Sequence, residues 1–288
     1  MKTVKPTIDF LINDSAVVYS LPMMYERINQ AINHPRSSID DITRIISEDQ
    51  GLSTRILKLA NSPMFGYYAR IDSITKAVTI IGTRQLRDLA LAISVMGVFK
   101  GIPEDLINMT SFWQHSIACG TIARILAICR RDANVERFFI AGMLHDVGRL
   151  ILCTRVPELM RELIEQSKES GCSLYSIERS VLGFDHGNVG GELLKRWKIP
   201  PSISEPVACH HVPVQVELFP IENGVIHVAD VIAHAMQIGS SGEQFVPPLD
   251  EHAWERLTLQ PSMLTTIIKQ ADVQLKETMG ILSEGGAS

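Results

Sequence analysis

The sequence predicts an all-α fold, and three observations support that prediction. Apolar residues recur at helical spacing along nearly the whole chain. The alternating patterns that are typical of strands are essentially absent. Apolar residues make up 45% of the 288 residues and charged residues 20%, so the chain can bury a core without disulfides. A mostly disordered chain is therefore excluded.

The first hundred residues have the pattern of a cluster of short helices. Ser38 followed by Asp41 is typical of a helix N-cap with an acidic first turn. Each of the apolar stripes that follow predicts a helix that buries one face. These stripes are Leu52, Ile56 and Leu59; Ile74, Val78 and Ile81; and Leu86, Leu89, Ile93 and Met96.

Longer helices are expected after residues 101–105, which form the best boundary candidate. We expect an N-terminal helical lobe over residues 1–108 and a second helical lobe over 109–288, packed closely as one unit. Residues 239–250 have the composition of a loop. The helices predicted for the second lobe span about 110–130, 134–152, 157–171, 175–182, 187–197, a segment around Asp230, and 261–283.

Charge and cysteine usage restrict the protein's compartment and partners. The formal charge of -5 disfavours nucleic acid as the main partner. The longest apolar stretch, 90–99, is too short to span a membrane, and the N-terminus lacks a signal-peptide pattern. The five cysteines form no CxxC pair, so we expect reduced, mostly buried thiols. These features predict a soluble cytoplasmic protein.

Histidines and aspartates concentrate in the second half of the chain, where helices could bring them together. His115 belongs to an apolar helix face. His145 and Asp146 end another apolar run, where two strongly polar residues are costly to bury without partners. Gly148, just after this pair, would let another group approach closely.

Further candidates follow downstream. His186 stands just before Gly187, where a helix could begin, and His210 and His211 are adjacent. His227 and His234 lie three residues before and four residues after Asp230, which places all three on one side of a helix.

Metal binding would explain these residues as one set. Neutral imidazole suits iron, nickel, copper and zinc, while carboxylates suit harder ions such as manganese and can bridge two cations. The alternative is that each histidine is a separately satisfied core or surface residue, which is the better explanation for any one of them alone. The His-Asp pair, the His-His pair and Asp230 together favour the metal site.

In this order, His115, His145-Asp146 and Asp230 resemble the ligand set of the HD superfamily of metal-dependent phosphohydrolases. With His186, His210 and His211 the pattern is similar to the HD-GYP cyclic di-GMP phosphodiesterases. The fuller resemblance is to the HDOD domain, the HD-related output domain of bacterial signalling proteins, over about residues 20–240. The motifs that carry it are Leu21-Pro22, IISEDQGLSTRILKLANSPMFG, SITKAVTIIGTRQLRDLAL, AGMLHDVGRLIL, FDHGNVGGELLKRWKIP and IHVADVIAHA.

The resemblance implies a two-lobed helical fold, with an N-terminal lobe packed on an HD-like core, and a regulatory role through signalling partners. HDOD domains often lack intact metal ligands, whereas here the ligand positions are largely intact. The resemblance thus implies one or two divalent transition metal ions, of iron, manganese, nickel or zinc. The implied ligands are His115, His145, Asp146, His186, His210, His211 and Asp230.

The chain departs from the phosphodiesterases in ways that leave three functions open. Arg149 replaces the lysine of their motif, the GYP signature is missing, and no upstream glutamate ligand is identified. We favour a non-catalytic signalling module that keeps a metal centre. The second alternative is a metal-dependent phosphohydrolase acting on a nucleotide or cyclic dinucleotide, with Asp146 and Arg149 as its catalytic residues. The third is binding of a phosphorylated small molecule without hydrolysis.

Overall fold

A computed structural model describes residues 5–13, 23–63, 65, 70–99, 101–213 and 218–283. All regular structure in these ranges is helical, without a strand, which confirms the predicted all-α fold. The Leu21-Pro22 motif and residues 64 and 66 of the longest motif lie outside the described residues. No helix within the described ranges is both long and apolar enough to cross a membrane.

Contacts within the chain divide it into two units, and each unit combines two separate stretches of the sequence. Unit 1 combines Met1–Tyr19 with Phe99–Ile268, and unit 2 combines Ser20–Val98 with Lys269–Ser288. The N-terminal helix therefore belongs with the second half of the chain. The division into lobes of residues 1–108 and 109–288 remains a prediction from the sequence.

Unit 2 contains short helices, of which the last three coincide with the three predicted apolar stripes, the second begins at the predicted N-cap, and the first was not predicted. They are α2 (Met23–Asn33), α3 (Ile39–Ser47), α4 (Gln50–Ala60), α5 (Ile74–Ile81) and α6 (Thr83–Met96). The Ser38 hydroxyl accepts a hydrogen bond from the Asp41 amide while the Asp41 carboxylate accepts one from the Ser38 amide, so the predicted cap is a capping box. The Asn61 side chain bonds both the amide and the carbonyl of Ile71, which ties the end of α4 to the segment before α5.

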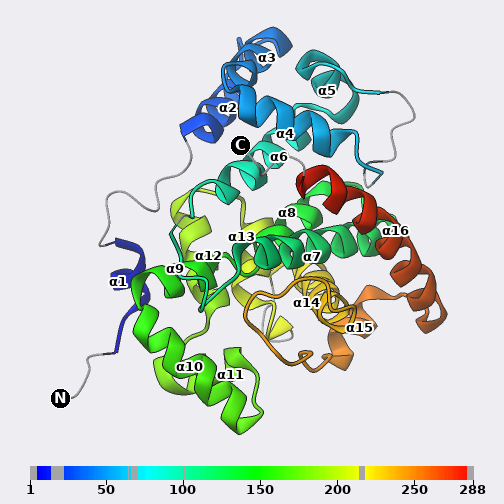
Figure 1. Ribbon diagram of the computed structural model, residues 1–288. Helices are drawn as coiled ribbons and strands as arrows, with labels where there is room; N and C mark the ends of the chain where they lie inside the picture. The colour runs from blue at the N-terminus through cyan, green and yellow to red at the C-terminus, as the bar shows by residue number, and fades with distance from the viewer. Residues whose placement is uncertain are drawn as a thin grey trace. The chain divides into compact units, whose positions relative to one another are not determined.

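Unit 1 contains the candidate site. The longer helices expected here are found only in part, because two helices have 22 and 16 residues but six have nine or fewer. In chain order the helices of this unit are α1 (Ile8–Asn13), α7 (Met109–Arg130), α8 (Glu136–Leu144), α9 (Val147–Arg155), α10 (Pro157–Ser170), α11 (Leu174–Leu182), α12 (His186–Arg196), α13 (Pro201–Cys209), α14 (Pro220–Ala235), α15 (Glu251–Leu257), the short 3-10 helix Pro261–Met263 and the first residues of α16 (Leu264–Ser283). Helix α7 packs on α8 and α14, and α12 packs on α9 and α13 (Figure 1). The predicted loop over 239–250 is confirmed.

The prediction of a single helix over 134–152 is wrong. The chain forms two helices, α8 and α9, which are separated by His145 and Asp146. Asp146 has φ −97° and ψ 5°, outside the helical region, and its carbonyl accepts a hydrogen bond from the Arg149 amide. In a continuous helix these neighbouring side chains would point about 100° apart. The interruption lets both of them enter the same site.

Glycines allow the helices around this interruption to pack with their backbones in contact. A Cβ atom on Gly142 of α8 would lie 2.8 Å from the Cα of Gly120 in α7. A Cβ on Gly148 of α9 would lie 2.0 Å from the carbonyl oxygen of His186 and 2.5 Å from the amide nitrogen of Gly190, both in α12. The close approach predicted at Gly148 is thus confirmed, and the group that approaches is the first turn of α12.

The N-terminal helix α1 lies against α9 and α12. Its Leu11 side chain is fully buried, and Asp9 pairs with Arg196 at 2.6 Å. These contacts explain why the N-terminal segment belongs to unit 1.

Candidate metal centre

Two buried aspartates form the middle of the candidate site, each 2% exposed. Asp146 stands between α8 and α9, and Asp230 lies on α14. The Nε2 atom of His145 is 3.2 Å from Asp146 Oδ2 and 3.3 Å from Asp230 Oδ1. On α7, His115 places Nε2 3.1 Å from Asp230 Oδ1. These four residues form the first half of the site.

The second half of the site faces the other oxygen of Asp146. The Nε2 atom of His186 lies 2.7 Å from Asp146 Oδ1, and that of His210 lies 3.7 Å from it. His211 follows, with its Nε2 3.0 Å from His186 Nε2. The structure therefore brings all seven predicted ligands together. Asp146 presents one oxygen to each half, which is the arrangement of a carboxylate that can bridge two cations.

Backbone carbonyls fix the orientation of three imidazole rings. The Nδ1–H of His145 donates to the Gly142 carbonyl at 2.7 Å, that of His210 to Val207 at 2.8 Å, and that of His234 to Asp230 at 3.0 Å. In its neutral form, each ring then has its lone pair on Nε2. Among the described residues, none of these three Nε2 atoms has a hydrogen-bond partner.

These donor atoms fit a divalent transition metal. Unpartnered buried nitrogens are costly, and imidazole nitrogens beside carboxylates are the donors that such ions prefer. Groups of three or four of the side chains place their donor atoms within 4.8 Å of one another. One group combines Asp146 with His186, His210 and His211, and another combines His115, His145 and Asp146.

The charges of the site are coupled to its protons. Burial alone would raise the pKa of Asp146, but His145, Arg149 and His186 hold that pKa well below its usual range. Burial would lower the pKa of His145, yet the carboxylate of Asp146, with that of Asp230, raises this pKa well above the usual value. Without a cation, protons on His145 and His186, whose pKa values are raised, balance the carboxylates. A divalent cation would supply the same positive charge, so a metal would compete with protons for the site.

Glu178 of α11 supports His186 from outside the cluster, a role that the motifs did not reveal. Its carboxylate accepts hydrogen bonds from His186 Nδ1 at 2.7 Å and from the His186 amide at 2.9 Å. Arg149, 1% exposed, donates to the hydroxyl and the carbonyl of Ser241 and pairs with Glu178 at 3.8 Å. A carboxylate behind a ligating histidine fixes its ring and raises its basicity.

The histidines on α14 have different surroundings despite their similar spacing from Asp230. His234 joins the cluster, with Nδ1 2.9 Å from Asp230 Oδ1, although it was not among the predicted ligands. His227 does not join it, because its Nδ1 donates to the His210 carbonyl and its Nε2 accepts from the Asp250 amide. Both ring nitrogens of His227 are therefore used in holding the backbone. Cys119 also lies beside the cluster, within a group formed with His145 and Asp230.

Two pockets lie near this region. One of about 270 Å³ is lined by Tyr175, His211, His227 and residues 247–250, and the Tyr175 ring stacks on His211 at 4.2 Å. His211 is thus the cluster residue that faces a pocket.

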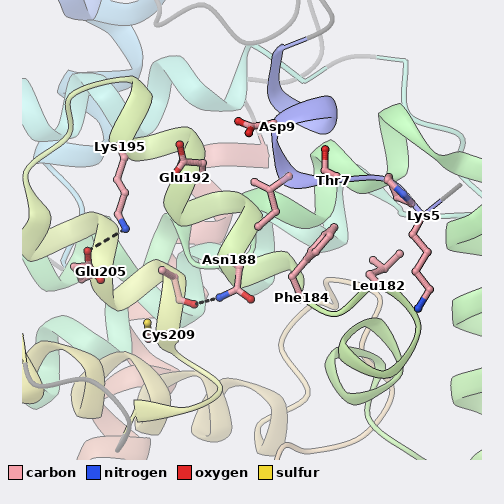
Figure 2. Close-up of a pocket in the computed structure, with 13 residues that line it drawn as sticks. Lys5, Thr7, Asp9, Leu182, Phe184, Asn188, Glu192, Lys195, Glu205 and Cys209 are labelled. Carbon is pink, nitrogen blue, oxygen red and sulfur yellow. Dashed lines mark hydrogen bonds and ion pairs between the residues drawn. The ribbon is translucent and has the colours of Figure 1, made fainter.

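The other pocket, of about 780 Å³, lies against α12 and α13 beneath the N-terminal segment (Figure 2). At one edge of this pocket, Lys195 pairs with Glu205 at 3.1 Å (Figure 2). Its lining mixes basic Lys5 and Lys195 with acidic Asp9, Glu192 and Glu205, so it favours neither sign of charge.

None of the five cysteines forms a disulfide in the described chain, and the prediction that most of them are buried holds for only two. Cys119 and Cys153 are buried, Cys129 and Cys209 are half-buried, and Cys172 is exposed.

Comparison with known proteins identifies the family. The chain aligns over 192 residues, at 28% identity, with an uncharacterized protein of Treponema pallidum; the alignment covers 66% of this chain and 37% of that protein, so this chain spans well under half of its length. The fold is similar to that of an HDOD domain protein of unknown function from Geobacter sulfurreducens, with a TM-score of 0.73, 24% identity and 93% of each chain covered. It is also similar to a candidate phosphohydrolase from Shewanella amazonensis, with a TM-score of 0.72, 22% identity, and 93% of this chain and 99% of that one covered. Residues 18–213 match the HDOD domain. The chain therefore belongs to the HDOD domain family.

Proposed function

We propose that this protein is a regulatory HDOD module that holds a two-ion transition metal centre and acts through protein partners in signalling. The observation that carries the proposal is the set of fixed, buried imidazoles whose Nε2 atoms face Asp146 and Asp230. In this proposal, His115, His145, Asp146 and Asp230 hold one ion, and Asp146, His186, His210 and His211 hold the other. With five free thiols, we place the protein in the cytoplasm.

The surroundings of the cluster favour a regulatory role over catalysis. The six ligands other than His211 are at most 2% exposed, which leaves little room for a substrate beside the ions. Arg149 was the candidate for contacting a phosphate group. Its guanidinium is instead buried and already bonded to Ser241. Metal and ligands in this arrangement would stabilise a conformation that a partner recognises.

The second candidate function is that of a metal-dependent phosphohydrolase, and one observation favours it. His211 lines the pocket of about 270 Å³, so the second half of the site borders a space that a small phosphorylated molecule could enter. Divalent ions there would polarise a phosphate group and lower the pKa of a bound water. His211 and Tyr175 would position the ligand at the pocket wall. Binding of such a molecule without hydrolysis would use the same surface.

Elemental analysis of protein purified without a histidine tag tests the metal centre. We expect the wild type to retain iron, manganese, nickel or zinc, and the double variant His145→Ala, Asp146→Ala to lose it. The control is His252→Ala, because His252 is exposed and pairs with Glu255 away from the cluster. Near-zero metal in both the wild type and the double variant would contradict the proposal.

A hydrolysis assay distinguishes the regulatory function from the enzymatic one. Metal-loaded wild type is assayed with cyclic di-GMP, bis-p-nitrophenyl phosphate and a nucleotide panel, and we expect no hydrolysis above the rate of the double variant. Sustained hydrolysis that the double variant lacks would favour the phosphohydrolase. Calorimetry with the same panel detects binding without turnover.

A further inference from the structure

Cys119 lies on α7 one helical turn after His115, and its side chain is fully buried. Its sulfur, a ring nitrogen of His145 and a carboxylate oxygen of Asp230 all lie within 4.8 Å of one another. The spacing of four residues puts Cys119 and His115 on the same face of α7. The thiol therefore faces the first half of the cluster.

The close packing of α7 on α8 brings this short side chain to the end of α8. Gly120, the residue after Cys119, meets Gly142, and a Cβ on Gly142 would lie 3.0 Å from the backbone carbon of Cys119. His145 follows Gly142 by one turn. With larger residues at the two glycines, the helices would stand farther apart and the sulfur would not reach the imidazole.

A second feature of the same place points to a ligand. The Nδ1–H of His145 is held by the Gly142 carbonyl, so Nε2 is the ring atom turned toward Asp146 and Asp230. The side chain of His145 is fully buried, and its Nε2 lies 3.2 and 3.3 Å from two carboxylate oxygens without a hydrogen bond of good geometry to either. A cation between this nitrogen, the thiol and the carboxylate would satisfy all three.

The plainer interpretation of a buried cysteine is a small apolar core residue. That interpretation suits Cys153 of α9, which is also fully buried but belongs to none of the donor groups among the described residues. Cys119 differs from Cys153 because its neighbours are an imidazole and a carboxylate.

We propose that the Cys119 sulfur is a ligand of the ion held by His145 and Asp230, which makes this half of the centre a thiolate, imidazole and carboxylate site. The proposal rests on the metal centre proposed above and adds a donor beyond its seven ligands. A thiolate favours zinc, iron(II) or cobalt over manganese and magnesium. The first half would therefore select a softer ion than a site of imidazole and carboxylate alone.

Cobalt(II) substitution tests this ligand by a spectroscopic signature that does not depend on activity. Protein is loaded with cobalt and desalted, the retained cobalt is measured by elemental analysis, and the near-ultraviolet spectrum is recorded. A thiolate bound to cobalt gives an intense charge-transfer band there, whereas imidazole and carboxylate ligands do not. We expect this band in the wild type and in Cys153→Ser. In Cys119→Ser we expect it to be lost while cobalt is still retained.

A complementary variant leaves Cys119 untouched, so the test does not depend on the folding of Cys119→Ser. Cys129, Cys153, Cys172 and Cys209 are all changed to serine, and Cys119 remains as the sole thiol. This variant should keep the band. X-ray absorption on its zinc-loaded form should show a sulfur neighbour at about 2.3 Å.

The possible outcomes test the role of Cys119 separately from the existence of the metal centre. Wild type that retains cobalt without the band would overturn the role of Cys119 and leave the metal centre intact. Wild type that retains no cobalt would overturn both proposals. A band that persists in Cys119→Ser, or that is missing from the variant with Cys119 alone, would assign the signal to another thiol and overturn the ligand.

Discussion

Glu178 and His186 are joined twice, because one carboxylate oxygen accepts both the ring Nδ1–H at 2.7 Å and the backbone N–H at 2.9 Å. The second ring nitrogen of His186 then faces Asp146 at 2.7 Å. Glu178 is fully buried, and the neighbouring His186 and Arg149 hold its pKa below the usual range even though burial acts to raise it. A charged carboxylate therefore orients this imidazole.

Glu178→Gln should weaken metal binding without removing any proposed ligand. The amide keeps the shape of the side chain but loses the charge that makes the imidazole a better donor, so we expect affinity to fall about tenfold or more. Competition with a coloured chelator measures this change. Glu158→Gln on α10, where the side chain is 85% exposed, is the matched control and should change nothing. Equal affinity in both variants would mean that Glu178 has no part in the centre.

His227→Gln should cost stability and leave metal content unchanged. Both ring nitrogens of His227 are bonded to backbone groups of His210 and Asp250, which would lose well-placed partners. We expect a loss of about 1–3 kcal/mol in the free energy of unfolding by denaturant titration. His210→Gln, by contrast, should lose metal, because His210 is a proposed ligand. A His227→Gln protein that folds normally but lacks metal would show that His227 is part of the centre.

These histidines show what sequence could and could not predict. Spacing placed His227 and His234 on the same side as Asp230, and both lie on α14 with it. Spacing could not distinguish them, because their roles depend on partners that are distant in the sequence. His227 Nε2 accepts a hydrogen bond from the Asp250 amide. The ring of His234 packs against that of His115, with 4.3 Å between the ring centroids. Glu178 was missed for the same reason, since its link to His186 is made by tertiary packing.

The same limit applies to the fold. Apolar periodicity predicted the helical class and most helices, because one buried face repeats every three or four residues. It did not predict the interruption at His145 and Asp146, where the sequence has no proline and where Asp146, the N-cap residue of α9, makes no side-chain capping hydrogen bond. The interruption lets both side chains contact partners that lie far away in the sequence, such as Asp230 and His186. Periodicity within one segment carries no information about such contacts.

Gly148→Ala should disrupt both the fold of unit 1 and the metal centre. The added methyl group would overlap the His186 carbonyl, which is backbone and cannot rotate away. We expect a loss of at least about 3 kcal/mol in stability and little bound metal. The control is Gly51→Ala on α4, where the added Cβ meets nothing closer than 3.4 Å and should stabilise the helix by up to about 1 kcal/mol. Thermal unfolding with metal analysis reports both effects, and a stable, metal-loaded Gly148→Ala would contradict this packing.

The pH dependence of stability should reverse sign when metal is bound. Burial and Arg149 act to lower the pKa of His186, but Glu178 and Asp146 raise it from 6.5 to about 9. In protein stripped of metal, the folded state holds this proton more tightly than the unfolded state. Its contribution is therefore fully present below pH 6.5 and is lost as pH rises toward 9.

Metal-loaded protein should become more stable over the same range, because protons no longer compete for the imidazoles. Unfolding titrations between pH 6.5 and 9, with and without chelator, compare the two slopes. His186→Gln, stripped of metal, should give a flatter profile than the stripped wild type. Parallel slopes with and without chelator would show that no metal is linked to His186.

The contacts of Gly142 with Gly120 and of Gly148 with α12 have a consequence for how this architecture can change over time. The distances between these helices are set by main-chain atoms, not by the side chains that point into the site. Exchanging an imidazole for an amide or an aliphatic group would leave the helices where they are. The helix spacing of this fold can therefore outlast the loss of single ligands, so related chains could keep the packing of these helices after the metal chemistry is gone.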